Sequence, residues 1–321
     1  MTIVADAVGS LVQAFRDHPD KYAAHRASAP ILGKLSETPE FLTAILADYL
    51  KSPQSLDRGH YPVVAVPIAV NPWFSLVANC WIPLPDGNTN LSTKAIHHHG
   101  NLLLTTVTLF GPGYQHWTFT TPEARDSSRQ RYRMALVEAA PHPQHHVAFV
   151  DRSIPHTPFF PPDLSITLAL FSNSLPTTWR DRLKRLPLIR GREQALRKIV
   201  KQLGLAKALD VKTVESFDFY PVADGFAVMK EREEFELGPN DDHVASLFYI
   251  LQRSGNAPLI ELIEERLASN DVGRGRAAVE RHLARFREGE QIGPKLSPGH
   301  YDRPDANFTG EAIREALEAT A

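Results

Sequence analysis

Ile96-His97-His98-His99-Gly100 stands just ahead of the apolar run Leu102-Leu103-Leu104. In an extended strand successive side chains point to opposite faces, so His97 and His99 would share one face while His98 points to the other. Imidazole is the commonest side-chain ligand for transition metals, and two of them on one face are typical of a metal site. The sequence therefore predicts a strand that supplies two metal ligands.

A third metal ligand has to come from another segment, because a His-x-His pair supplies two. The best candidate is His156, in Ser153-Ile154-Pro155-His156-Thr157-Pro158. This proline-flanked turn lies shortly before an apolar strand predicted over 165–172, so it would place the imidazole at the mouth of a returning strand. The predicted metal ligands are His97, His99 and His156. The alternatives are that the first two lie on the solvent face of an edge strand and that the third hydrogen-bonds its own turn.

Residues 60–174, which contain these histidines, have the composition of short β-strands. Runs rich in β-branched and aromatic residues are separated by turn sequences such as Pro85-Asp86-Gly87-Asn88 and Gly111-Pro112-Gly113. Many short strands at such spacing predict an antiparallel barrel or sandwich. The predicted strands cover residues 63–66, 74–82, 102–110, 114–119, 146–150 and 165–172. The charged segment 123–133 is expected to form a loop or an edge excursion.

Helical sequence flanks the β-rich region on both sides, since apolar residues recur there at helical spacing. The predicted helices include residues 8–15, 41–50, 244–252, 259–267, 277–286 and 311–319. The expected organisation is an N-terminal helical segment over 1–59, a β-barrel over 60–175, and a mainly helical C-terminal region over 176–321 with a short β-hairpin near 216–230. The predicted fold class is therefore a mostly β core with α extensions.

Two motifs resemble those of the cupin superfamily, whose small barrel binds a metal through two such segments. They are Ala95-Ile96-His97-His98-His99 and the Pro155-His156 turn that leads into the alternating strand 165–172. Within the superfamily they are most similar to three-histidine non-haem iron enzymes related to cysteine dioxygenase. The resemblance covers roughly residues 61–174, about a third of the chain. It implies a cupin (double-stranded β-helix) barrel around a mononuclear metal.

The sequence differs from the family pattern at two places, and these differences limit which ligands and which reaction the resemblance implies. Many cupins carry a Glu four or five residues after the His-x-His, where this chain has Leu103 or Leu104. The resemblance therefore implies three neutral ligands and no carboxylate ligand from that position. Thiol dioxygenases present Ser, His and Tyr on the strand after the third histidine, and the corresponding residues here are Thr167, Ala169 and Phe171. Oxidation of cysteine itself is therefore not expected.

The function implied by the resemblance is that of an O2-dependent oxygenase or dioxygenase, an oxidoreductase acting on a small molecule at the three-histidine site. Three neutral imidazoles leave a divalent ion its full charge and about three open positions of an octahedron. Fe(II) is the expected metal, Zn, Ni, Cu and Mn stay open, and no organic cofactor is expected. Two other functions stay open: a non-redox cupin lyase, isomerase or hydrolase, and a metal- or ligand-binding barrel with helical arms for assembly.

The substrate pocket is expected to adjoin the metal ligands. Its predicted lining residues are Tyr114, His116, Phe159, Thr167 and Phe171. Alternation puts His116 on the same side as Tyr114, and Phe159 follows His156 closely enough to shape its surroundings. A further histidine cluster is expected in a surface turn rather than a metal site, because prolines flank it: His142, His145 and His146, with Pro141 and Pro143.

Composition restricts the expected partners and compartment. A net charge of -2 over 321 residues offers no overall basic surface for nucleic acid, and no uncharged apolar run approaches the roughly 20 residues of a membrane span. One cysteine, Cys80, excludes an intramolecular disulfide, and together with an N-terminus unlike a signal peptide it predicts a cytoplasmic protein with a buried, inert thiol.

A basic block over 180–207 and an acidic block over 210–242 are expected to meet each other or a symmetry mate, which leaves a homodimer open. The expected partners are a small-molecule substrate and O2.

Overall fold

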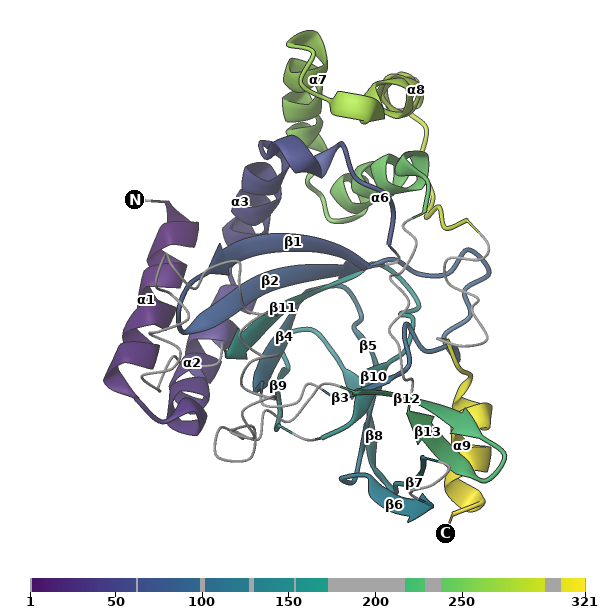
Figure 1. Cartoon of the computed structure of the whole chain (residues 1–321). Coiled ribbons are helices and arrows are strands. Elements are labelled where there is room, and N and C mark those ends of the chain that lie inside the picture. The colour runs from purple at the N-terminus through teal and green to yellow at the C-terminus, as the bar shows by residue number, and fades with distance from the viewer. Residues whose placement is uncertain are drawn as a thin grey trace, which may run out of the picture.

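Two curled antiparallel β-sheets face each other in the computed structural model and form a half-barrel (Figure 1). The structure describes residues 2–61, 63–98, 102–126, 130–152, 154–172, 217–228, 238–297 and 307–320. The five-stranded sheet consists, in spatial order, of β1 (Val63–Val70), β2 (Phe74–Trp81), β11 (Ser165–Ser172), β4 (Leu104–Phe110) and β9 (Val147–Val150). The eight-stranded sheet consists of β6 (Glu123–Asp126), β7 (Arg131–Arg133), β13 (Gly225–Val228), β12 (Phe217–Val222), β3 (Ile96–His98), β10 (His156–Pro158), β5 (Tyr114–Phe119) and β8 (Leu136–His142).

Helices lie before and after the sheets in the chain. The described α-helices are α1 (Ile3–Asp17), α2 (Lys21–Ser36), α3 (Pro39–Leu50), α6 (Asn240–Arg253), α7 (Ile260–Ala268), α8 (Arg276–Arg287) and α9 (Gly310–Glu318), with 3-10 turns at Pro53–Ser55, Ala257–Leu259 and Gly273–Gly275. Side-chain caps begin several of them: Thr2 accepts from the Ala5 N–H, and Asp20 accepts from the Ala23 N–H. None of the helices in the described part of the chain has the length and apolar character needed to cross a bilayer.

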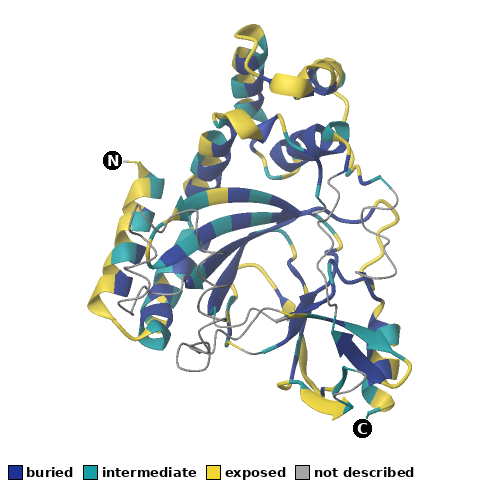
Figure 2. Ribbon diagram, viewed as in Figure 1, coloured by how far each residue is buried: buried dark blue, intermediate teal, exposed yellow. Residues whose placement is uncertain are grey.

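The largest core of the described residues lies between the outer face of the five-stranded sheet and the helices α1–α3 and α6–α8. On β11, Ile166, Leu168 and Leu170 face this core, whereas Thr167 and Ala169 face the other sheet. The same core includes buried residues of α1, α2 and α3 as well as of α6, α7 and α8. Figure 2 shows α6 with its buried residues packed close to the sheet. One continuous apolar cluster therefore joins the N-terminal and C-terminal helices across the sheet.

A second core covers the outer face of the eight-stranded sheet. Ile96, Phe119 and Phe226 are fully buried there, and α9 packs over them through Ile313 and Ala316. The inner faces of the two sheets, defined as the faces that the sheets turn toward each other, meet where the Trp81 ring contacts Tyr114 with 4.8 Å between ring centroids. Both sheets thus have an apolar outer face, and the chemistry-bearing residues lie on the inner faces.

The predicted fold class, a mostly β core flanked by N- and C-terminal helices, is confirmed by the two facing sheets and the helices around them. The charged segment expected to be a loop or an edge excursion contains the edge strand β6 and its neighbour β7. The hairpin near 216–230 is present as β12 and β13, and it extends the eight-stranded sheet by pairing with β3 and β7. The basic block over 180–207 and part of the acidic block over 210–242 lie outside the described residues.

Candidate functional site

Two of the predicted metal ligands, His97 and His156, lie directly opposite each other on neighbouring strands. The eight-stranded sheet places β3 beside β10, and His97 is the register partner of His156. Their ring centroids are 6.2 Å apart with the ring planes at 87°. Both residues are buried, with 7% and 4% of their surface exposed. Sheet topology therefore brings together two histidines that are far apart in the sequence.

The third predicted ligand, His99, lies outside the described residues, so its placement beside these two stays a prediction. His98 belongs to β3, where its backbone pairs with Phe217. Within the described ranges, no group of three or more His, Cys, Asp or Glu side chains has a metal-binding arrangement. The described site is therefore a pair of imidazoles to which one further ligand has to be added.

A carboxylate from the C-terminal hairpin contacts His97, one member of this pair. Asp218 of β12 is the register partner of His97, and His97 Nδ1–H donates a hydrogen bond to its Oδ1. The two side chains are 9% and 15% exposed. In His156 the Nδ1 lies 3.4 Å from the Ile154 carbonyl oxygen. Because both partners are acceptors, Nδ1 carries the proton in each ring and the lone pair is on Nε2.

These tautomers fit a metal site. A histidine ligand commonly donates its second ring N–H to a carboxylate or a backbone carbonyl, which fixes the ring and leaves the lone pair of the other nitrogen for the ion. His97 has the first kind of partner and His156 the second. The described residues therefore fit two of the ligands of a three-histidine centre.

His116 lies next to this pair on the inner face. It is the register partner of Pro158 on β10, and its ring centroid is 5.2 Å from that of His156. Burial, with the charge of Lys94 as a smaller cause, lowers the pKa of His116 to about 4. Its imidazole is therefore neutral at pH 7 and can accept or pass a proton.

Tyr114 and Trp81 extend the inner face toward the five-stranded sheet. Burial raises the pKa of the Tyr114 hydroxyl far above its ordinary value, although hydrogen bonds with Thr106 and Thr167 act in the opposite direction. Trp81 Nε1–H donates to Thr167 Oγ1 at 2.8 Å. The phenol thus stays protonated, and its surroundings combine aromatic surface with hydroxyl groups.

The far wall of the inner face is apolar. Leu104, Ala169 and Val150 form a small buried cluster, against which Phe171 packs. Leu104 occupies one of the two positions at which many cupins carry a glutamate. The next residues of β4 that face inward are Thr106 and Thr108. No carboxylate from β4 therefore reaches this space.

Phe159, one of the residues predicted to line the pocket, lies in the second core. Phe159 is 2% exposed and packs against Trp117, with 4.8 Å between ring centroids, in the core beneath α9. Alternation along β10 explains this placement: His156 and Pro158 face inward, so the residue after them faces outward.

The expectation that His142 lies in a surface turn is wrong. His142 is the last residue of β8, pairs with Tyr114, and is 2% exposed. Pro141 is tolerated before it because β8 is an edge strand of the sheet, where a missing N–H breaks no ladder bond. Burial lowers the pKa of His142 to about 3, and its Nδ1 lies 3.1 Å from the Nδ1 of the exposed His146.

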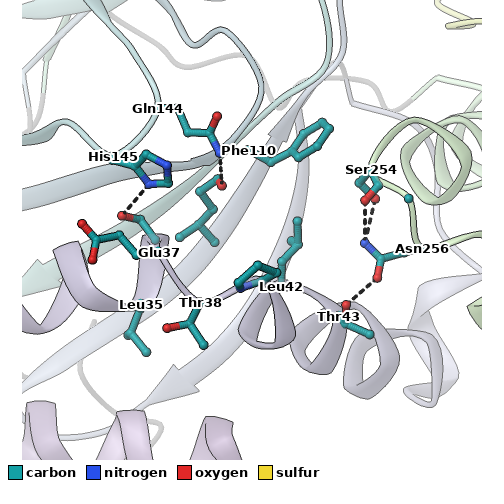
Figure 3. A pocket seen from close by; sticks show the side chains of 14 residues that line it. Leu35, Glu37, Thr38, Leu42, Thr43, Phe110, Gln144, His145, Ser254 and Asn256 are labelled. Atoms are coloured by element: carbon teal, nitrogen blue, oxygen red, sulfur yellow. Dashed lines mark hydrogen bonds between the residues drawn. The ribbon is translucent and has the colours of Figure 1, made fainter.

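A separate pocket of about 520 Å³ lies on the helical side of the five-stranded sheet, among α2, α3 and the end of α6 (Figure 3). Several of its polar lining groups hydrogen-bond to protein atoms. His145 Nδ1 is 3.2 Å from Ser36 Oγ, Gln144 Nε2 donates to the Leu109 carbonyl, and Thr43 donates to Asn256. These groups connect loops to α2, α3 and β4, and the pocket lining does not include His97 or His156.

No family model and no curated protein matches the chain. Solved structures resemble its β-rich part. An RmlC-like cupin from Shewanella frigidimarina is 10% identical, with 35% of this chain and 78% of that chain covered and a TM-score of 0.21. A cupin domain from Schizosaccharomyces pombe is 7% identical, with 40% and 78% covered and a TM-score of 0.27. A nucleoside dehydratase from Streptomyces is 10% identical, with 35% and 72% covered and a TM-score of 0.22. Similarity of this extent supports no argument about activity, and the fold assignment rests on the two facing sheets themselves.

Proposed function

We propose that the chain is a metal-dependent enzyme whose centre is His97, His99 and His156, and that it oxidises a small molecule with O2. The observation that carries the proposal is the in-register pair His97 and His156, each with an acceptor at Nδ1. Both rings lie on the inner face of the eight-stranded sheet and are buried.

The resemblance to three-histidine iron enzymes favours Fe(II), whereas three imidazoles by themselves also suit Zn, Ni and Cu. Three neutral imidazoles, with no carboxylate from β4, leave about three positions of an octahedral ion for substrate and O2. Bound Fe(II) would supply the redox chemistry that couples oxidation of the substrate to reduction of O2. Zn, Ni, Cu and Mn at the same ligands are alternatives that metal analysis separates.

The surrounding residues have separate roles in this proposal. His116, neutral and beside His156, would hold or pass a proton of the bound substrate. The protonated Tyr114 hydroxyl would donate a hydrogen bond to it. Trp81 and Phe171 would form apolar walls that keep water from the centre.

Metal analysis tests the proposal. The protein, purified without added metal, is expected to contain about one transition metal per chain and to consume O2 with Fe(II) and one member of a panel of thiols, amino acids and diketones. His97→Ala and His156→Ala should each lose the metal. His18→Ala, which changes an exposed histidine after α1, is the matched control and should keep it. Full metal content in both site variants would overturn the proposal.

A second function is favoured by the pairing of His116 with Tyr114. Their ring centroids are 6.1 Å apart, and one is a neutral base while the other is a protonated acid at pH 7. Such a pair suits a metal-dependent lyase or isomerase, in which one group removes a proton and another supplies one. Protein that purifies with zinc and consumes no O2 with any member of the panel would favour this function over the oxygenase.

A further inference from the structure

We propose that Asp218 is a positioning residue for the metal centre, and that the C-terminal hairpin β12–β13 thereby completes a site otherwise built from the barrel. The inference rests on the proposed three-histidine centre. It gives a role to a segment that lies 121 residues after His97 in the chain and outside the part that resembles cupins.

The backbone places the Asp218 carboxylate. Asp218 and His97 are register partners on adjacent antiparallel strands, so their side chains project from the same face of the sheet. The hairpin itself is anchored by Phe219 and Phe226, which are 2% and 0% exposed in the core beneath α9. It is held further by the pairing of β13 with β7. The contact with His97 is therefore set by strand register and core packing.

The carboxylate has two effects on His97 as a ligand. Accepting the Nδ1–H bond fixes the tautomer and the ring orientation, so that the Nε2 lone pair is presented in one direction. Its negative charge also increases electron donation by the imidazole and partly balances a divalent ion. Because the carboxylate accepts from His97 Nδ1–H, this charge acts through a histidine. Strand β4 supplies no carboxylate of its own, since its inner face carries Leu104, Thr106 and Thr108.

A purely structural ion pair would predict something different. It would stabilise the hairpin, and its removal would lower the melting temperature of the metal-free protein without a specific effect on metal affinity. A positioning role predicts a loss of affinity larger than any loss of stability, with partial rescue by a residue that keeps the acceptor oxygen. Asn provides this distinction, because its amide oxygen can accept from Nδ1–H but carries no charge.

The experiment measures the dissociation constants of Co(II) and Zn(II) by competition with a chelator, together with the Co(II) visible spectrum and the melting temperature of the metal-free protein. Asp218→Ala should weaken binding of both ions by roughly 10- to 100-fold, and Asp218→Asn by less. The Co(II) bands should shift in both variants. Asp224→Asn is the matched control in the same hairpin: it weakens an exposed pair with Arg131 and should leave the affinity unchanged.

Wild-type affinity in Asp218→Ala would overturn the inference and leave the histidine centre standing. If that variant does not fold, wild-type affinity and an unshifted Co(II) spectrum in the near-isosteric Asp218→Asn would overturn it equally. A full-length wild-type protein that binds neither ion would instead overturn the proposed centre, and this inference with it. The two failures are therefore distinguishable.

Discussion

His116 is the residue on which the chemistry next to the metal ligands depends most in this proposal. We predict that His116→Gln lowers kcat by about 100-fold, because a positioned general acid or base contributes 10²- to 10⁴-fold. Metal content should stay at the wild-type level, since the residue adjoins His156 without being one of the proposed ligands. Steady-state kinetics and metal analysis on the same preparations measure both quantities.

His145→Gln is the control for this variant, because His145 is an exposed histidine of the separate pocket in Figure 3. It should leave kcat unchanged. Loss of metal in His116→Gln would contradict the assigned role and make His116 a ligand instead. Unchanged kcat together with unchanged metal content would assign the proton transfer to another group.

Side-chain alternation made several individual residues predictable from the sequence. It gave the inward direction of His116 relative to Tyr114, and the same rule, applied one residue further along β10, would have turned Phe159 outward. Cys80 was expected to be a buried, inert thiol, and burial raises its pKa to about 12. Asp218 could not be found in this way. A single carboxylate among aromatic strand residues can be recognised in the sequence as unusual. Its partner His97 cannot, because the two residues meet only through the pairing of β12 with the distant strand β3.

Among the elements, those with a regular apolar pattern were predictable, and those at the sheet edges were less so. Helices and the central strands of the five-stranded sheet bury one face against a core, so their sequences carry that periodicity. Strands β6 and β7 expose most of their charged residues, and β8 contains Pro141, so neither a buried face nor a strand-like composition marks them. Their strand state follows from pairing with neighbours, a tertiary property.

Arg266 of α7 connects two elements that the sequence keeps far apart. Its guanidinium donates to the carbonyls of Leu50 and Ser52 and to Ser55 Oγ, at 2.7 to 2.8 Å. The Leu50 carbonyl belongs to the last turn of α3. Carbonyls in the last turn of a helix have no helical N–H four residues further on, so they need another donor. Only 10% of the Arg266 side chain is exposed, so these acceptors are shielded from water.

We predict that Arg266→Lys lowers the free energy of unfolding by about 2 to 3 kcal/mol, because one ammonium group cannot reach acceptors that the planar guanidinium fork serves together. Urea denaturation measures the change. The control is Arg287→Lys, which alters an exposed pair with Glu264 and should cost no more than about 0.5 kcal/mol. Equal costs in the two variants would show that the Arg266 contacts are energetically equivalent to a surface ion pair.

At the scale of the whole molecule, one core unites chain ends that the sequence suggested were separate segments. The α1–α3 and α6–α8 helices share the apolar cluster on the outer face of the five-stranded sheet. Each group of helices also buries a titratable histidine. His25 of α2 and His243 of α6 are both 1% exposed, and burial lowers their pKa values to about 4 and about 3. Protonation of either one inside this core is disfavoured.

The stability of the protein should therefore fall as the pH falls below about 6.5. In the unfolded chain both histidines bind a proton as the pH falls through their ordinary pKa of about 6.5. In the folded protein they stay neutral until a much lower pH. Between these pH values the unfolded state binds more protons than the folded state, so lowering the pH favours unfolding. Each contributes a loss of roughly 1.4 kcal/mol per pH unit, or about 4 kcal/mol for the two between pH 7 and pH 5. Denaturant unfolding across this range measures the slope. The buried His116 and His142, whose pKa values are also lowered, add to the total slope. His25→Phe keeps an aromatic ring between Phe15 and Phe149 and should remove the share of one histidine, about 2 kcal/mol between pH 7 and pH 5, while His18→Gln, at an exposed position, should leave the slope intact. Stability that stays constant or rises toward pH 5 would contradict burial of these imidazoles in the neutral form.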